Sequence, residues 1–143
     1  MSSWQADLPV PPIRSRLIAV LWAFPIACFS LTLLCDVAYW RSENLLWQNF
    51  SSWLLAAGLL CGSMAVLWWL LGLMMGWWGA HWRGMALAVA ILIAAFVNSV
   101  IHAGDGWTAV VPWGIALSIV TVFLMLASGF LSGRNARRGR RQP

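Results

Sequence analysis

Hydrophobic residues form four long blocks along the chain, at about residues 17–40, 53–78, 85–101 and 109–131. Crossing the hydrocarbon core of a bilayer takes roughly 20 residues of α-helix, with a range of about 17–25. The pattern therefore predicts an all-α integral membrane protein built as an antiparallel four-helix bundle. A polar lead-in at residues 1–16 precedes the bundle (17–131), and an arginine-rich tail at residues 132–143 follows it.

The composition agrees with this fold class. Of the 143 residues, 62% are hydrophobic and 9% are charged, whereas a soluble domain carries about 25% charged residues. The net charge is +5, and all nine basic residues are arginine. Arginines beside a span are attracted to anionic lipid, so we expect lipid or an acidic partner, and not nucleic acid, to contact the tail. Its five arginines are Arg134, Arg137, Arg138, Arg140 and Arg141.

The arginines also predict the orientation. Arg14 and Arg16 precede the first block, Arg83 lies between the second and third, and the tail has five more, whereas Arg41 alone lies on the other side. Cytoplasmic loops carry the excess of basic residues. Both termini are therefore expected in the cytoplasm, in a multi-pass protein of the bacterial inner membrane. Whether the chain forms a homo-oligomer is left open.

Each block carries a stripe of small or polar residues. Because apolar side chains gain little by leaving lipid, membrane helices associate through close backbone contacts and hydrogen bonds. The second block has two GxxxG steps, Gly58–Gly62 and Gly72–Gly76. In the first block, Pro25 leaves a backbone carbonyl that neighbouring groups must satisfy. Its stripe is Pro25, Cys28, Thr32 and Asp36, and that of the fourth block is Gly114, Ser118, Thr121, Met125 and Ser128.

A polar cluster is predicted at the outer end of the bundle. Asp36 lies near the end of the first block, and Asn98 and His102 are one turn apart near the end of the third, with Asp105 and Trp107 just beyond. Ionisable groups inside a membrane are costly and are usually paired or functional. Four interpretations stay open: a lock between helices, a pocket for a small ligand such as a quinone headgroup, haem ligation through His102, and nucleophilic catalysis. No metal site is expected.

Haem ligation meets a distance constraint. His81 and His102 are separated by 21 positions, or about 31 Å along a helix, so one protomer cannot supply both ligands to one iron.

Tryptophan is abundant in the chain, and its side chain favours the depth of the lipid headgroups. Most of the twelve lie at expected interfaces: Trp40, Trp47, Trp53, Trp107 and Trp113 outside, and Trp68, Trp69, Trp77, Trp78 and Trp82 toward the cytoplasm.

The stretches FPIACFSLTLLCDVAYW and VNSVIHAGDGWTAVVPWG resemble a bacterial inner-membrane family catalogued as domain of unknown function 2231, over about residues 18–133. The resemblance implies four spans and no established biochemical role. It also implies an association with electron-transfer modules, since some relatives are joined to cytochrome c domains or periplasmic quinoprotein dehydrogenases. Many relatives carry a histidine shortly before the FPI motif, but RSRLIAV has none, which weakens a haem or metal role based on that histidine.

We therefore expect a non-catalytic accessory subunit of a larger inner-membrane electron-transfer complex, respiratory or photosynthetic, with other membrane subunits and lipids as partners. No cofactor is expected in this interpretation. The alternative is an electron-transfer subunit that binds a quinone or haem b at the outer cluster and serves a periplasmic dehydrogenase.

Overall fold

The computed structural model describes residues 13–77, 82–104 and 110–139, and they form four α-helices and no strand. Each helix is long and apolar enough to cross a membrane. The prediction of an all-helical fold with four helices long and apolar enough to span a membrane is confirmed for the described residues. The helices are α1 (Ile13–Ser42), α2 (Leu45–Met74), α3 (Trp82–His102) and α4 (Trp113–Gly139).

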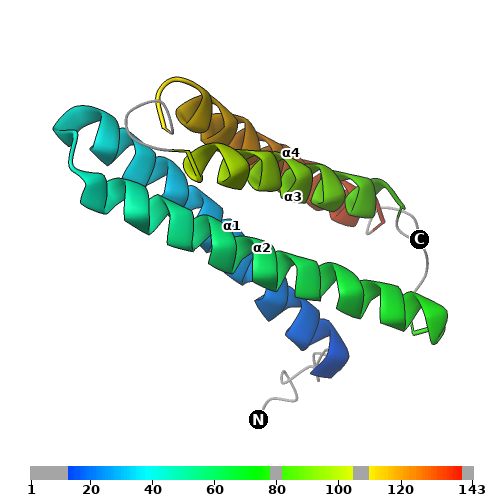
Figure 1. The fold of residues 1–143 in the computed structure, drawn as a ribbon. Coiled ribbons are helices and arrows are strands. Elements are labelled where there is room, and N and C mark those ends of the chain that lie inside the picture. The colour runs from blue at the N-terminus through cyan, green and yellow to red at the C-terminus, as the bar shows by residue number, and fades with distance from the viewer. Residues whose placement is uncertain (1–12, 78–81, 105–109, 140–143) are drawn as a thin grey trace, which may run out of the picture.

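The helices pack in a ring in which each contacts two neighbours. α1 lies against α2 and α4, and α3 lies against the same two helices. Figure 1 shows α1 beside α2 and α3 beside α4, with one pair laid across the other. Large apolar side chains cover the outer surface of the ring, and Leu34 and Phe123 are 64% and 69% exposed. Lipid acyl chains around the bundle would explain this exposure, because so large an apolar surface is unfavourable in water.

α2 begins earlier than the hydrophobic pattern suggests. The polar segment 41–52 reads as a loop, yet the helix starts at Leu45, directly after Glu43 and Asn44. Asn44 caps it, because its side-chain oxygen accepts a hydrogen bond from the N–H of Leu46 at 3.0 Å. Glu43 takes a positive φ of 54° and turns the chain between the helices. This tight connection brings the first turns of α2 beside the last turns of α1.

The interior is built from the stripes of small residues. Phe29, Leu55, Ile91 and Ala95 form the central apolar cluster. Beside it, α2 approaches its neighbours through glycines: a Cβ on Gly58 would stand 2.5 Å from the Phe29 ring, and one on Gly62 would stand 2.6 Å from Leu92. Pro25 is buried and also lies against Gly62. These contacts agree with helix packing by Pro25, Gly58 and Gly62.

The second GxxxG step is placed differently by the structure. Gly72 is buried within α2, but Gly76 lies beyond the end of the helix, with a φ of +69° and nothing within 4 Å of its open side. A left-handed residue of this kind ends a helix, which glycine does at little steric cost. Gly76 therefore terminates α2 and makes no helix contact there.

Trp69 differs from the other described tryptophans because it is buried, at 8% exposed, whereas Trp40, Trp47, Trp53, Trp82 and Trp113 are exposed. It packs edge-on against Trp82, with 6.1 Å between the ring centroids. Trp69 is therefore part of the interior near the end of α2. Trp78 and Trp107 lie outside the described residues.

Candidate functional site

A buried group of polar side chains joins all four helices, and we call it the Asp36 network. Asp36, Asn98 and His102, which the sequence predicts to meet, are 0%, 1% and 3% exposed. Two serines complete the group, and both are buried. The network is Asp36 on α1, Ser51 on α2, Asn98 and His102 on α3, and Ser118 on α4.

The positions of these residues along their helices explain why they meet. Asp36 lies near the end of α1 and Ser51 near the start of α2, on either side of the short Glu43–Asn44 connection. His102 is the last residue of α3, and Ser118 lies in the first turns of α4. Asp36 faces inward because it continues the buried stripe of Pro25, Cys28 and Thr32. The network therefore lies toward one end of the bundle.

Both carboxyl oxygens of Asp36 are occupied by groups from other helices. Oδ1 lies 2.5 Å from the Ser51 hydroxyl and 2.9 Å from His102 Nε2. Oδ2 lies 2.5 Å from the Ser118 hydroxyl. One side chain on α1 is thus bonded to α2, α3 and α4. The Ser51 hydroxyl has a second acceptor within reach, the Thr32 carbonyl at 3.3 Å.

The amide of Asn98 fixes the direction of the bond from Ser118. Asn98 Nδ2 donates to Ser118 Oγ at 2.8 Å, so the serine oxygen accepts from Asn98 and its single proton goes to Asp36. Asn98 Oδ1 has no hydrogen-bond partner among the described residues. A buried oxygen without a donor is uncommon in folded proteins. It is the one acceptor of the network that is left over.

The imidazole of His102 links two protein acceptors. Nδ1 lies 3.0 Å from the backbone carbonyl of Asn98, and because a carbonyl only accepts, Nδ1 must carry a hydrogen. Nε2 faces Asp36 Oδ1 at 2.9 Å, and that contact is a hydrogen bond only if a proton lies between the two atoms. The proton belongs either to an imidazolium facing a carboxylate or to a carboxylic acid facing a neutral ring. In both forms the Asp36–His102 pair has no net charge.

The geometry of the network suits it to join helices. Neither of two apolar cavities elsewhere in the bundle is lined by any of its residues. His102 uses both ring nitrogens, so ligation of an iron by this residue would require one of its hydrogen bonds to break. Within the described part of the chain, no group of three histidine, cysteine or acidic residues could hold a metal ion.

Some predicted site residues cannot be placed. Asp105 and Trp107 fall outside the described residues, as does His81. In the tail, α4 continues to Gly139, and Arg134 lies over the Phe130 ring, 5.6 Å from its centroid. The side chains of Arg137, Arg138, Arg140 and Arg141 also lie outside the described residues.

Sequence reasoning misses two of the five members of the network as site residues. The hydrophobic pattern places Ser51 in a loop, although the serine pair at residues 51–52 just before a long apolar block is a signal worth testing on a helix face. Ser118 is predicted on the correct stripe of the fourth helix, but only in a packing role. Recognising it as a partner of Asp36 requires the rotation of α4 relative to α1, which one sequence does not give.

No curated protein and no solved structure gives a significant match to the chain. A family model does match, over residues 18–140, which include the whole Asp36 network, and its description is that of a predicted membrane protein. With its four apolar helices and the quoted motifs, the chain belongs to the family described as "Predicted membrane protein (DUF2231)".

Proposed function

We propose that the protein is a non-catalytic accessory subunit of the bacterial inner membrane, in which the Asp36 network holds the bundle together and the outer surface meets lipid and partner spans. The observation that carries this proposal is the occupation of both Asp36 oxygens by groups from three other helices. A substrate that bound at Asp36 or His102 would have to replace bonds that these side chains already make.

The energetics support a role in holding helices. A charged carboxyl group costs about 2.5–3.5 kcal/mol at the centre of a membrane helix on insertion scales, which is an upper value for Asp36 near the end of α1. Hydrogen bonds between membrane helices contribute about 0.6 kcal/mol each on average. Bonds from Ser51, His102 and Ser118 offset much of the cost. Tight bundle assembly, therefore, is the effect that these contacts produce most directly.

The proposal includes the orientation. Consecutive helices run antiparallel, which places the lead-in, the connection that carries Arg83 and the C-terminal tail on the cytoplasmic side. Eight of the nine arginines then lie in the cytoplasm, and Arg41 lies outside. This distribution follows the rule that short loops on the cytoplasmic side of the membrane carry the excess of basic residues. The Asp36 network then lies in the outer half of the membrane.

The partner is proposed to be a larger electron-transfer assembly. That part of the proposal rests on the family resemblance. The broad apolar surface of the helices is suited to contact with other membrane subunits as well as with lipid.

One observation favours a second candidate, a subunit that binds a quinone at the network. Asn98 Oδ1 is buried and has no partner among the described residues, so it could accept a hydrogen bond from a quinol hydroxyl. Binding would require the bundle to open beside Asn98. The contacts of Asp36 and His102 favour the first candidate, because a ligand would have to replace them.

The test is gentle detergent extraction from native membranes, followed by mass spectrometry of the co-migrating proteins and an absorption spectrum. We expect stoichiometric membrane subunits with redox centres and no haem band from this chain expressed alone. A Soret band from the isolated chain would contradict the accessory role. If this chain migrates without other proteins after an extraction in which the redox complexes remain intact, the proposed partner is contradicted.

A further inference from the structure

An apolar cavity opens in the half of the bundle opposite the Asp36 network. It measures about 390 Å³ and all four helices line it. Trp22 and Pro25 contribute from α1, Trp69 from α2 and Met85 from α3. These residues lie in the first half of α1, near the end of α2 and near the start of α3, so the cavity is in the half of the bundle that carries the N-terminus. Small-molecule sites have volumes of about 300–1,000 Å³.

Two glycines show that this space is not filled by helix packing. Gly84 of α3 and Gly129 of α4 line the cavity, and a Cβ added to either would have nothing within 4 Å. Gly58 and Gly62 are the opposite case, since neighbouring side chains stand within 3 Å of their open sides. Gly84 and Gly129 are exposed, so the cavity is open beside them.

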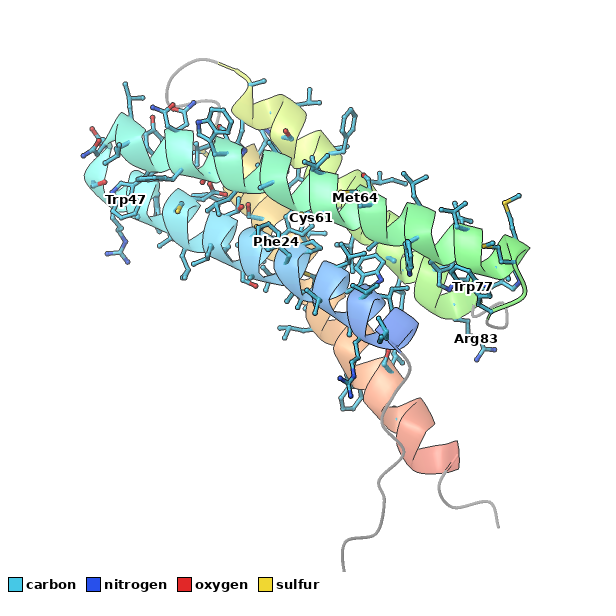
Figure 2. The ribbon with its side chains drawn as sticks, turned by 90° about the horizontal axis from the view of Figure 1, so that it is seen from below. Phe24, Trp47, Cys61, Met64, Trp77 and Arg83 are labelled. Atoms are coloured by element: carbon cyan, nitrogen blue, oxygen red, sulfur yellow. The ribbon has the colours of Figure 1, made fainter. Side chains whose placement is uncertain are left out.

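Three described arginines lie around the same end. Arg83 directly precedes Gly84, Arg134 follows the lining residue Ser132, and Arg16 lies on α1 about 9 Å before Trp22. All three are exposed. Figure 2 shows Arg83 at the end of α2, near Trp77, with its side chain directed away from the helices. Within the described residues, no ion pair joins these arginines to an acidic side chain.

We propose that this cavity binds one acyl chain of an anionic phospholipid, whose phosphate is held by Arg16, Arg83 and Arg134. Apolar cavities are not filled by water, and an empty one forfeits the dispersion contacts of its lining atoms. In a membrane the nearest filler is a lipid chain. The chain gains packing but little hydrophobic free energy, because it leaves surroundings that are equally apolar. Headgroup contacts therefore set the preference between lipids.

The charge of the rim determines which lipid is retained. A basic residue at the membrane surface favours anionic lipid by about fivefold, and each arginine that reaches the headgroup adds to this preference. A zwitterionic lipid has the same chains and lacks the net charge. The proposal depends on the location of the chain in a membrane, and not on the identity of a partner complex.

The experiment uses the full chain, reconstituted into vesicles of equal phosphatidylglycerol and phosphatidylcholine, extracted gently and examined by native mass spectrometry. We expect one retained phosphatidylglycerol, favoured over phosphatidylcholine by at least about fivefold. Gly84→Leu and Gly129→Leu should each lower this retention about tenfold, because the added carbons take the place of chain atoms and their contacts. Arg83→Gln should lower the preference for phosphatidylglycerol while the retained lipid remains.

Two variants serve as matched controls. Ala86→Leu adds similar bulk on the exposed face of α3, and Arg41→Gln removes an arginine at the other end, where it lies over Trp40. Neither substitution should change the retention of phosphatidylglycerol.

Unchanged retention of phosphatidylglycerol in both glycine variants would overturn the site. Equal retention of the two lipids by the wild type, or a retained quinone in place of phospholipid, would overturn the assigned occupant. Arg83 is exposed, so its variant tests the headgroup even if a leucine variant fails to fold.

Discussion

Asp36 has a hydrogen-bonded partner on every other helix of the bundle. The three contacts, from Ser51, His102 and Ser118, are 2.5–2.9 Å long and fully buried. A residue of this kind is expected to be sensitive to the loss of its oxygen atoms and less sensitive to the loss of its charge. The distinction separates a structural role from proton or ligand chemistry.

We predict that Asp36→Asn is tolerated and Asp36→Leu is not. An asparagine amide at the position of Oδ1 can donate to His102 Nε2 and to the Ser51 hydroxyl, which then donates to the Thr32 carbonyl. Leucine leaves the buried partners unpaired, at about 1–3 kcal/mol for each group. Thermal unfolding of the purified protein in detergent measures the difference. If the asparagine variant is as unstable as the leucine variant, the negative charge itself is required.

Ser118→Ala should also destabilise the bundle. The hydroxyl accepts from Asn98 Nδ2 and donates to Asp36 Oδ2, so its removal leaves two buried groups unpaired. We expect a loss of about 1–3 kcal/mol for each of these groups, above the average of ~0.6 kcal/mol for a bond between membrane helices. The control is Ser30→Ala, because the Ser30 hydroxyl bonds the Ile26 carbonyl of its own helix. Equal unfolding midpoints for the two variants would contradict the prediction.

At the scale of elements, α2 is the helix with the closest approaches. A Cβ added to Gly58 would stand 2.5 Å from the Phe29 ring and 3.1 Å from the Cβ of Cys28, whereas Gly62 faces the flexible end of Leu92. Phe29 is 2% exposed, and the Cβ of Cys28 is fixed to the backbone of α1 and cannot rotate away. Leu92 is only partly buried. The two glycines of one GxxxG step therefore have different tolerances.

We predict that Gly58→Ala costs more stability than Gly62→Ala. The methyl group at Gly58 forces a buried ring and the backbone of α1 to shift, and overpacking of this kind costs about 1–3 kcal/mol. At Gly62 the Leu92 side chain can rotate toward lipid, and alanine has the better helix propensity. The measurement is the thermal unfolding midpoint of each variant in the same detergent. A larger loss from Gly62→Ala would show that the contact between α2 and α3 is the tighter one.

The elements themselves are predictable from the sequence, because a block of about 20 apolar residues has few alternatives to a membrane helix. Their ends are less so. Residues 41–52 contain charged and amide side chains that are typical of a loop, and hydropathy does not detect a capped helix that starts at Leu45. Ser51 is missed for that reason. Asp36, Asn98 and His102 are found because polar residues in apolar blocks are few. The cavity is not predictable, since the sequence does not distinguish its two open glycines from glycines that pack.

At the scale of the whole molecule, the proposed orientation can be tested directly. A fluorescent protein that matures only in the cytoplasm should be active when fused after residue 143, and a phosphatase active only outside should be inactive there. Insertion of the same phosphatase at the Glu43–Asn44 connection should give activity. The arginine asymmetry is the physical reason. Phosphatase activity at the C-terminus would reverse the orientation and place the Asp36 network in the inner half of the membrane.

The neutrality of the Asp36–His102 pair has a consequence for an energised membrane. A potential of 100 mV acts on each elementary charge that crosses it with about 2.3 kcal/mol, enough to strain a lone carboxylate inside a helix bundle. If the 2.9 Å contact between Asp36 Oδ1 and His102 Nε2 is a hydrogen bond, the pair shares one proton and carries no net charge on which the field can act. With no net charge on the pair, we expect the contacts of the Asp36 network to be independent of the membrane potential.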